Sequence, residues 1–341
     1  MKKFTLSQRT ILFSTILLVF TIGMATPSAN AAVGDILRVV DANGFIDPAS
    51  CSIGMSFDGT HLYWTDCFDG RIWITDTAAV PTVIDVRDFS TEIPEDPNAM
   101  SFDSARGVTY VATQFGGATC EIYVIDHKGT FNNLQDDTVS LLFAAPIAEV
   151  GNCFIDGLAY NQNDPIAGAD ALYVSGDAQS VMSIYLLDGT LVSTVDTSLI
   201  APGAATTSGL AVGGSTLYLA NNGGGDVFRA SLPALTLIDQ FVSDDERQED
   251  LECDTVTFAP TDVMWLRTTP QGNPVNNFAT AFEIEPDTCE LGGGGIPVGG
   301  EIIPINTSAL LLAGVQSISM WMIPVVVSGA GIGVFVIKRR N

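Results

Sequence analysis

The chain has 341 residues, and its 39 acidic and 14 basic side chains give a formal net charge of −25. All acidic residues lie between Asp35 and Glu301, whereas six of the basic residues belong to the two ends, so the part between carries a formal charge of −31. A surface this negative repels nucleic acid and anionic headgroups. Nucleic-acid binding is therefore excluded as a function.

The N-terminus has the order of segments of a secretory signal peptide. Lys2, Lys3 and Arg9 precede an uncharged run over residues 11–25, and small residues follow up to Ala31. Basic, apolar and small-residue segments in this order predict export and cleavage after residue 31. The alternative is that residues 1–31 stay in the membrane as an N-terminal anchor.

The C-terminus predicts a single membrane span. Residues 309–337 contain no charge and are followed by a basic tail over 338–341. About 20 helical residues already cross a hydrocarbon core of about 30 Å. Basic residues stay on the cytoplasmic side, so the predicted ectodomain, residues 32–290, lies outside the cell and is joined to the membrane by the Gly-rich linker 291–308.

Six cysteines fall in the exported part, where thiols are oxidised to disulfides. No pair has the CxxC spacing of a zinc site. Placing each cysteine at a strand end predicts one bridge within a repeat, one between repeats, and a third by elimination: Cys51 with Cys67, Cys120 with Cys153, and Cys253 with Cys289.

The middle of the chain repeats a pattern of short strands. Each of five copies has an apolar strand, a turn, a strand rich in aromatic and β-branched residues, a polar loop and a third strand, and the first four add a fourth apolar stretch. The copies are anchored about 45 to 58 residues apart by Met55, Met100, Leu158, Leu210 and Val256. This is the length of a four-stranded propeller blade. The fold class is therefore all-β, a β-propeller of five blades, with six as the alternative.

The fifth copy lacks its fourth strand. The segment Ile36–Asp41 stands alone ahead of the first copy and has the composition of a strand. Completing the last blade with this first strand would close the ring and leave no unpaired sheet edge between the chain ends.

The repeat, clearest over residues 157–189, resembles the blades of NHL-type, YVTN-type and gluconolactonase-like propellers. The segments GGEIIPINTSALLLAG and WMIPVVVSGAGIGVFVIKRR are similar to the C-terminal anchors of surface proteins from ammonia-oxidising archaea. The second resemblance implies an archaeal cell-surface protein. A motif, a span and a basic cluster also look like a sorting signal, in which case a transpeptidase removes the helix.

The propeller resemblance implies a metal site at the channel entrance. Asn98, Asp156, Ser208 and Asp254 precede the expected channel strands of copies two to five. Oxygen ligands from several blades suit a calcium ion, which gluconolactonase-like propellers hold there. Their pattern also requires a glutamate near the first blade, where this chain has Ile53, so a lactonase activity is in doubt. The alternative is that these side chains cap tight turns.

Loops after the second strands share the same face of the expected ring. They carry polar side chains that are candidates for binding a sugar, a peptide or a partner protein, although turn residues need no ligand. These candidates are Asp66, Asp69, Gln114, Asp177, Asn221 and Asn222.

No nucleophilic triad is expected, because His61 and His127 fall on the opposite face from these loops and no GxSxG motif precedes a helix. We therefore favour a surface propeller that acts as a binding or scaffold module for a partner, a glycan or an envelope component, with Ca²⁺ as the possible ion. The alternative is a metal-dependent extracellular lactonase, and a third possibility is an element of the surface layer.

Overall fold

The computed structural model describes residues 32–289, apart from short gaps. The described residues are 32–46, 53–66, 70–114, 119–177, 179–201, 207–243, 247–268 and 277–289. All of them belong to the first of two compact units, which ends at Ile296. The predicted signal peptide, linker, membrane span and tail lie outside these residues, as do Cys51, Cys67 and Asp69. Within the described ranges, no helix is long and apolar enough to cross a membrane.

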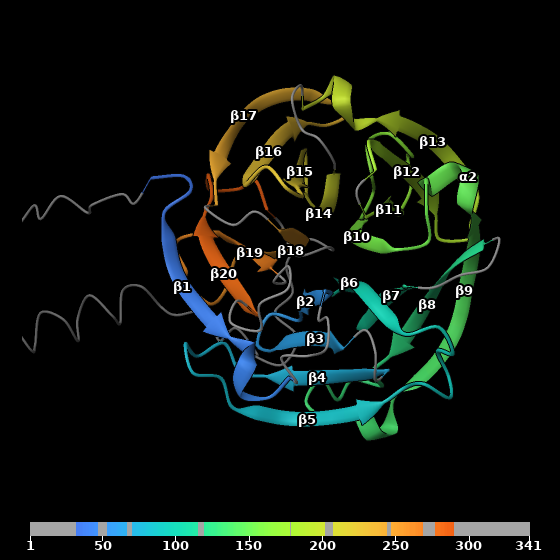
Figure 1. The fold of residues 1–341 in the computed structure, drawn as a ribbon, viewed down its shortest axis with the longest axis vertical. Helices are drawn as coiled ribbons and strands as arrows, with labels where there is room; N and C mark the ends of the chain where they lie inside the picture. The colour runs from blue at the N-terminus through green and yellow to red at the C-terminus, as the bar shows by residue number, and fades with distance from the viewer. Residues whose placement is uncertain are drawn as a thin grey trace, which may run out of the picture. The chain divides into compact units, whose positions relative to one another are not determined.

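Five antiparallel sheets of four strands each are arranged around a common axis (Figure 1). Four of these blades use consecutive strands. Blade one has β2 (Met55–Phe57), β3 (Leu62–Asp66), β4 (Arg71–Thr75) and β5 (Val83–Asp88). Blade two has β6 (Pro97–Asp103), β7 (Val108–Thr113), β8 (Thr119–Asp126) and β9 (Thr138–Pro146). Blade three has β10 (Ile155–Asn161), β11 (Ala171–Gly176), β12 (Val181–Leu186) and β13 (Leu191–Asp196). Blade four has β14 (Thr207–Gly213), β15 (Thr216–Asn221), β16 (Asp226–Ser231) and β17 (Thr236–Val242).

The fifth blade joins the two ends of the domain. Its strands are β18 (Gln248–Asp254), β19 (Val263–Thr268), β20 (Phe278–Glu283) and β1 (Ile36–Asp41). Strand β1 pairs antiparallel with β20, for example Val40 with Ala279. The prediction that Ile36–Asp41 closes the ring is confirmed, and so are the all-β class and the five blades.

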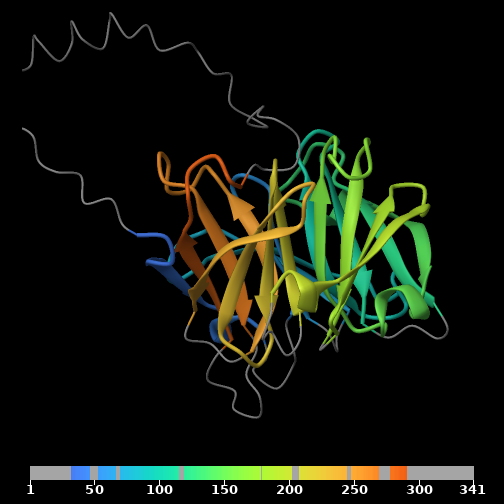
Figure 2. The same ribbon diagram turned by 90° about the horizontal axis from the view of Figure 1, so that it is seen from above.

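Short helical segments lie only in the connections of the described chain: η1 (Ala42–Gly44), η2 (Leu134–Asp136), α2 (Ile147–Val150) and η3 (Thr197–Leu199). In the view at right angles, the strands run between the two faces of the ring (Figure 2). We call the face at which the innermost strands β2, β6, β10, β14 and β18 begin the front face, and the opposite one the back face.

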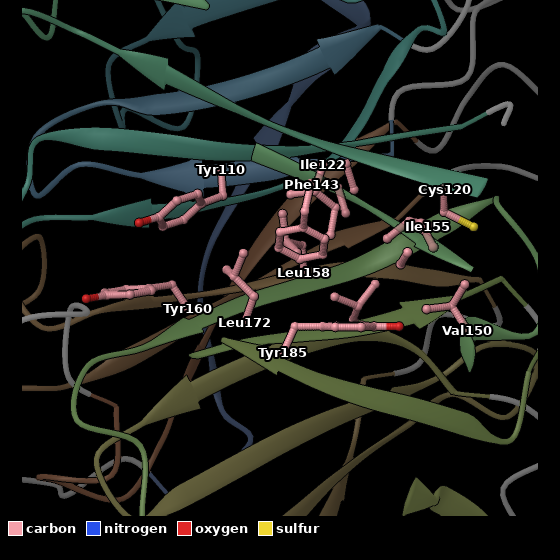
Figure 3. Packing of buried hydrophobic residues seen from close by; sticks show 14 of the residues in the cluster. Tyr110, Cys120, Ile122, Phe143, Val150, Ile155, Leu158, Tyr160, Leu172 and Tyr185 are labelled. Carbon is pink, nitrogen blue, oxygen red and sulfur yellow. The ribbon is translucent and has the colours of Figure 1, made fainter. Parts of the chain in front are cut away.

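Apolar residues of neighbouring blades pack against each other, so each of the five hydrophobic clusters joins two blades. Between blades two and three, Tyr110 and Ile122 meet Leu158 and Tyr185 (Figure 3). The middle strands are apolar on both sides because both of their faces are covered. An outermost strand such as β13 instead alternates toward solvent.

The innermost strands approach each other closely, and this explains the glycine just ahead of β2 and those at the third positions of β10 and β14. A Cβ on Gly54 would lie 1.7 Å from the Asn98 carbonyl oxygen, and one on Gly209 would lie 2.1 Å from that of Glu249. No side chain fits at such distances, so the glycines fix the spacing of the blades. In β18 the equivalent residue is Asp250, whose side chain turns toward the axis.

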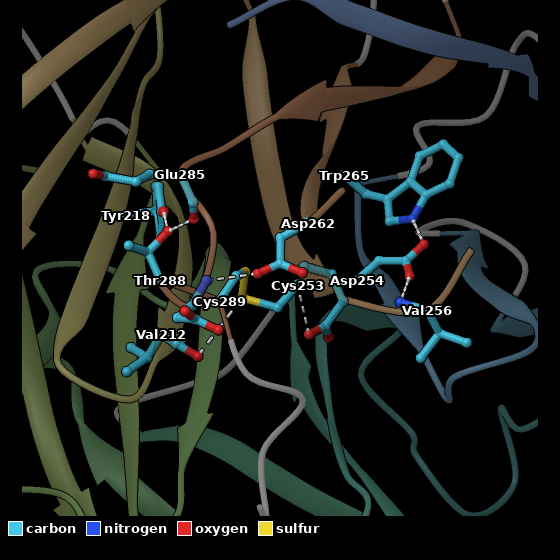
Figure 4. The surroundings of a disulfide bond; sticks show 12 residues. Val212, Tyr218, Cys253, Asp254, Val256, Asp262, Trp265, Glu285, Thr288 and Cys289 are labelled. Atoms are coloured by element: carbon cyan, nitrogen blue, oxygen red, sulfur yellow. Dashed lines mark hydrogen bonds between the residues drawn. A yellow bond between two sulfur atoms is a disulfide. The ribbon is translucent and has the colours of Figure 1, made fainter. Parts of the chain in front are cut away.

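Four blades repeat the same hydrogen-bonding arrangement of an aspartate at the back face. The aspartates, in blade order, are Asp58, Asp103, Asp164 and Asp254. One carboxylate oxygen accepts two backbone N–H groups of the following turn, as Asp254 does from Val256 and Thr257 (both 2.8 Å). The other oxygen accepts from an aromatic side chain of the second strand, here Trp265 Nε1 at 2.9 Å (Figure 4). Each aspartate therefore ties its turn to the blade core.

The sequence prediction for the innermost strand of blade five was wrong. The β-branched segment beginning at Thr255 was expected to line the channel, but the strand is Gln248–Asp254 and Val256 is 46% exposed in the next turn. Local β-propensity favoured the wrong segment, because aspartate and glutamate are depleted in strands in general.

Two of the predicted disulfides are confirmed. Cys120 bonds Cys153, with Cα atoms 4.9 Å apart, and Cys253 bonds Cys289 at 5.3 Å. The first joins blade two to blade three at the front face. The second joins the end of β18 to the chain after β20, at the back face (Figure 4).

Candidate metal centre

Four buried polar side chains converge at the front face, each from the residue preceding the close-approach position of its innermost strand. They are Asn98, Asp156, Ser208 and Glu249, of blades two to five in turn. Asn98 Nδ2 donates to Asp156 Oδ1 at 3.0 Å. Ser208 Oγ donates to Asp156 Oδ2 at 2.9 Å and lies 3.3 Å from Glu249 Oε2. The side chains of successive blades, from blade two to blade five, are therefore in direct contact.

The loops after the second strands add Asp177 and Asn222 to this group. Asn222 Nδ2 donates to Asp177 Oδ1 at 3.0 Å and lies 3.5 Å from both Ser208 Oγ and Glu249 Oε2. Oxygen atoms of Asp156, Asp177 and Glu249 all lie within 4.8 Å of one another. We call these three carboxylates the carboxylate triad.

The electrostatics of the carboxylate triad are unfavourable without a cation. Burial raises the pKa of Asp156 well above its usual value, and the charges of Glu249 and Asp177 raise it further. Among the described residues, Arg247 is the basic group in direct contact, through Nε to Glu249 Oε1. Burial alone would lower the pKa of Arg247, but the charge of Glu249 raises it overall. One guanidinium cannot neutralise three adjacent carboxylates.

The donor set fits a hard divalent cation. Carboxylate and amide oxygens are the ligands that Ca²⁺ takes in proteins. A second observation points the same way, since Asn98 is fully buried, its amide touches Asp156, and its Oδ1 has no hydrogen-bond partner. A buried carbonyl oxygen without a donor is uncommon in native proteins. A cation between the carboxylates would use these oxygens and cancel their repulsion.

The structure divides the residues predicted for the metal site. Asn98 and Asp156 lie together at the front face. Asp254 instead lies at the back end of β18, where both of its carboxylate oxygens accept hydrogen bonds within blade five. Its place at the front face is taken by Glu249. Sequence reasoning missed Glu249 because it lies in an acidic stretch that resembles a solvated loop. The signal was present, since EDL at 249–251 aligns with DGL at 156–158 and SGL at 208–210.

The residues predicted to bind a ligand are also divided. Asp177 and Asn222 belong to the cluster, while Asn221 is buried and its backbone N–H donates to Gln248 Oε1 at 3.0 Å. Gln114 is buried, with its backbone N–H bonded to Asp96. Asp66 ends β3, and Asp69 lies outside the described residues.

Both histidines lie in structural networks at the back face, as their predicted strand positions required. His127 is buried between Thr109 Oγ1 and Asp137 Oδ2, each 2.8 Å away. This resembles a nucleophilic triad in connectivity, but all three side chains are at most 5% exposed. His61 Nδ1 contacts Asp58 at 2.9 Å.

The chain is similar to solved structures of other proteins. No protein-family model matches the sequence, and no curated protein is significantly similar to it. The PQQ-bound aldose sugar dehydrogenase of Streptomyces coelicolor is 11% identical, with 74% of this chain and 98% of that chain covered and a TM-score of 0.46. The glutaminyl cyclase of Myxococcus xanthus is 12% identical, with coverage of 76% and 98% and a TM-score of 0.49. A luciferin-regenerating enzyme is 12% identical, with coverage of 74% and 99% and a TM-score of 0.44. These similarities assign the chain to no family and to no activity.

Proposed function

We propose that the propeller binds a divalent cation, Ca²⁺ by donor type, at its front face and uses it to hold an oxygen-rich ligand such as a glycan. The observation that carries the proposal is the carboxylate triad beside the unpartnered Asn98 Oδ1. Asp156 and Glu249 are buried, whereas Asp177 is only half-buried. A ligand can therefore approach the ion from the side of Asp177.

The site acts outside the cell in this proposal. The predicted signal peptide and membrane span support that location, and so does the Cys120–Cys153 disulfide, because such bonds persist in oxidising compartments. Recovery of the native protein from the cytosol with reduced thiols would contradict it.

Calcium is expected to stabilise the domain, and chelation with EDTA is expected to reverse the effect. A ligand present at 100 times its Kd stabilises the folded state by about 2.7 kcal/mol. Asp177→Asn and Glu249→Gln should weaken binding of Ca²⁺, or of the probe Tb³⁺, by about 100-fold or more, since even outer-shell substitutions cost 10 to 100-fold. Calorimetry and Tb³⁺ luminescence measure this.

The matched control is Asp188→Asn, which removes a fully exposed carboxylate in the turn after β12. It should bind Tb³⁺ as the unmodified domain does. Equal Tb³⁺ binding by Asp177→Asn, Glu249→Gln and the unmodified domain would contradict the metal centre.

The second candidate function is metal-assisted hydrolysis of a lactone. Asp177 favours it, because a half-buried carboxylate at the mouth of an ion site can accept a proton from water. A bound divalent ion would supply Lewis-acid chemistry, and Asn98, Asp156 and Glu249 would hold it. Titration of acid release from glucono-lactone should show turnover that EDTA abolishes and that Asp177→Asn lowers. Calcium binding without turnover would contradict the lactonase and leave the binding function as the remaining candidate.

A further inference from the structure

Arg267 is a buried guanidinium that contacts no carboxylate among the described residues. It lies near the front end of β19 and is fully buried. Nη1 donates to the carbonyl oxygens of Thr268 and Phe278, both at 2.7 Å, and Nη2 contacts Asn277 Oδ1. All these acceptors are neutral, and no carboxylate of the described residues lies within 4.0 Å, the limit for an ion pair.

This is unusual in so acidic a domain. At least five of the eight basic residues in the described part of the chain contact a carboxylate directly, namely Arg87, Arg106, Lys128, Arg229 and Arg247. Burial lowers the pKa of Arg267 to about 9, so the group still carries its charge at neutral pH. A buried charge without a counterion in direct contact is unfavourable.

Two N–H donors in this place have no acceptor. Arg267 Nε is buried without a hydrogen-bond partner, and so is Nδ2 of Asn277, which is 2% exposed. The two groups already touch through Asn277 Oδ1. A carboxylate has two oxygens and a negative charge, and so it satisfies both donors and the guanidinium together. A neutral water molecule would leave the charge unbalanced.

The donors lie beside the carboxylate triad. Thr268, which follows Arg267, pairs with Gln248, which precedes Glu249, so the two groups sit on adjacent strands at the same end. The charges of Glu249 and Asp250 act on Arg267 from a distance and partly offset the effect of burial on its pKa. The two groups are therefore neighbours at the front end of blade five.

We propose that Arg267 and Asn277 form an anion subsite for the carboxylate of a ligand whose hydroxyl oxygens bind the neighbouring cation. The ligand class is then an acidic sugar or another hydroxycarboxylate. This inference rests on the proposed function for the shared ligand, while the anion subsite itself stands on the unpartnered donors.

The decisive variant is Asn277→Asp, which places a carboxylate against Arg267 and supplies the missing anion from within. In calcium, the unmodified domain should bind glucuronate at least about 10-fold more tightly than glucose, as expected for a charged hydrogen bond. Asn277→Asp and Arg267→Met should lose that preference. Arg229→Met, which removes a buried arginine already paired with Asp239 and Glu285, should keep it. Calorimetry measures binding, and Trp64, whose ring lies 5.2 Å from the guanidinium, reports it by fluorescence.

The two proposals can fail separately. Without metal, acetate should raise the thermal midpoint of the unmodified domain but not that of Asn277→Asp, which should itself melt higher and still bind Tb³⁺. If the unmodified domain does not bind Tb³⁺, the metal centre is contradicted and the anion subsite is not. The anion subsite is overturned if glucose binds as well as glucuronate, if chloride stabilises as much as acetate, or if folded Asn277→Asp binds glucuronate unchanged.

Discussion

Asp250→Ala is expected to lower the free energy of unfolding by about 2 to 4 kcal/mol, since each buried N–H group left without an acceptor costs about 1 to 3 kcal/mol. Asp250 Oδ2 accepts the backbone N–H groups of Met55 at 3.0 Å and of Met100 at 3.1 Å. These groups lie on the free edges of β2 and β6. One carboxyl of blade five therefore fastens blades one and two at the axis.

The equivalent positions show why only blade five carries this residue. Three blades have glycine there, and blade two has Ala99, so an alanine Cβ is tolerated at this position in one other blade. Removal of Asp250 thus tests the lost hydrogen bonds rather than a steric clash. Burial raises the pKa of Asp250 well above its usual value, which indicates that a neutral group is favoured at this position.

Asp250→Asn is the matched control for this prediction. Its amide oxygen can still accept both N–H groups, so we expect it to lose less than about 1.5 kcal/mol, the net value of one hydrogen bond. Urea unfolding followed by circular dichroism and tryptophan fluorescence compares the variants. An alanine variant as stable as the asparagine variant would show that Asp250 does not hold the ring.

Most of the fold could be predicted from the sequence, because in four blades the local sequence pattern agrees with the structure. Apolar strands, turn residues and spacing agree in those copies. The lone strand Ile36–Asp41 could be assigned to the fifth copy, which lacked a fourth strand. Blade five differs because its innermost strand, QEDLECD, is built for tertiary contacts. Asp250 and Glu252 are buried there against neighbouring strands, and no local pattern predicts a strand of carboxylates.

The candidate site followed the same division. Asn98 and Asp156 were predicted correctly as neighbours because their strands are typical, and Asp254 was placed wrongly with its strand. The anion subsite had no sequence signal at all. A buried arginine without a carboxylate is visible only once the surrounding atoms are known, since Arg267 stands in the ordinary apolar strand VMWLRT.

Removing the Cys253–Cys289 disulfide with a double alanine variant is expected to destabilise the domain by about 4 kcal/mol in the loop-entropy model for a separation of 36 residues. The Cys120–Cys153 bond closes a similar separation of 33 residues, so its loss should cost about as much. Equal loss in urea unfolding is the first expectation.

The two variants should nevertheless loosen different parts of the ring. Blade five is the place where the chain ends meet, and β1 is held there without any covalent bond to β20. Cys289 fixes the chain after β20, which also packs Ile284 against Phe282 and lets Thr288 Oγ1 contact Tyr218 at 2.6 Å. Without that bond, amide hydrogen exchange should speed up in β1, β19 and β20, whereas the Cys120–Cys153 variant should change blades two and three. Faster exchange spread evenly over all five blades would mean that ring closure does not depend on where the disulfide lies.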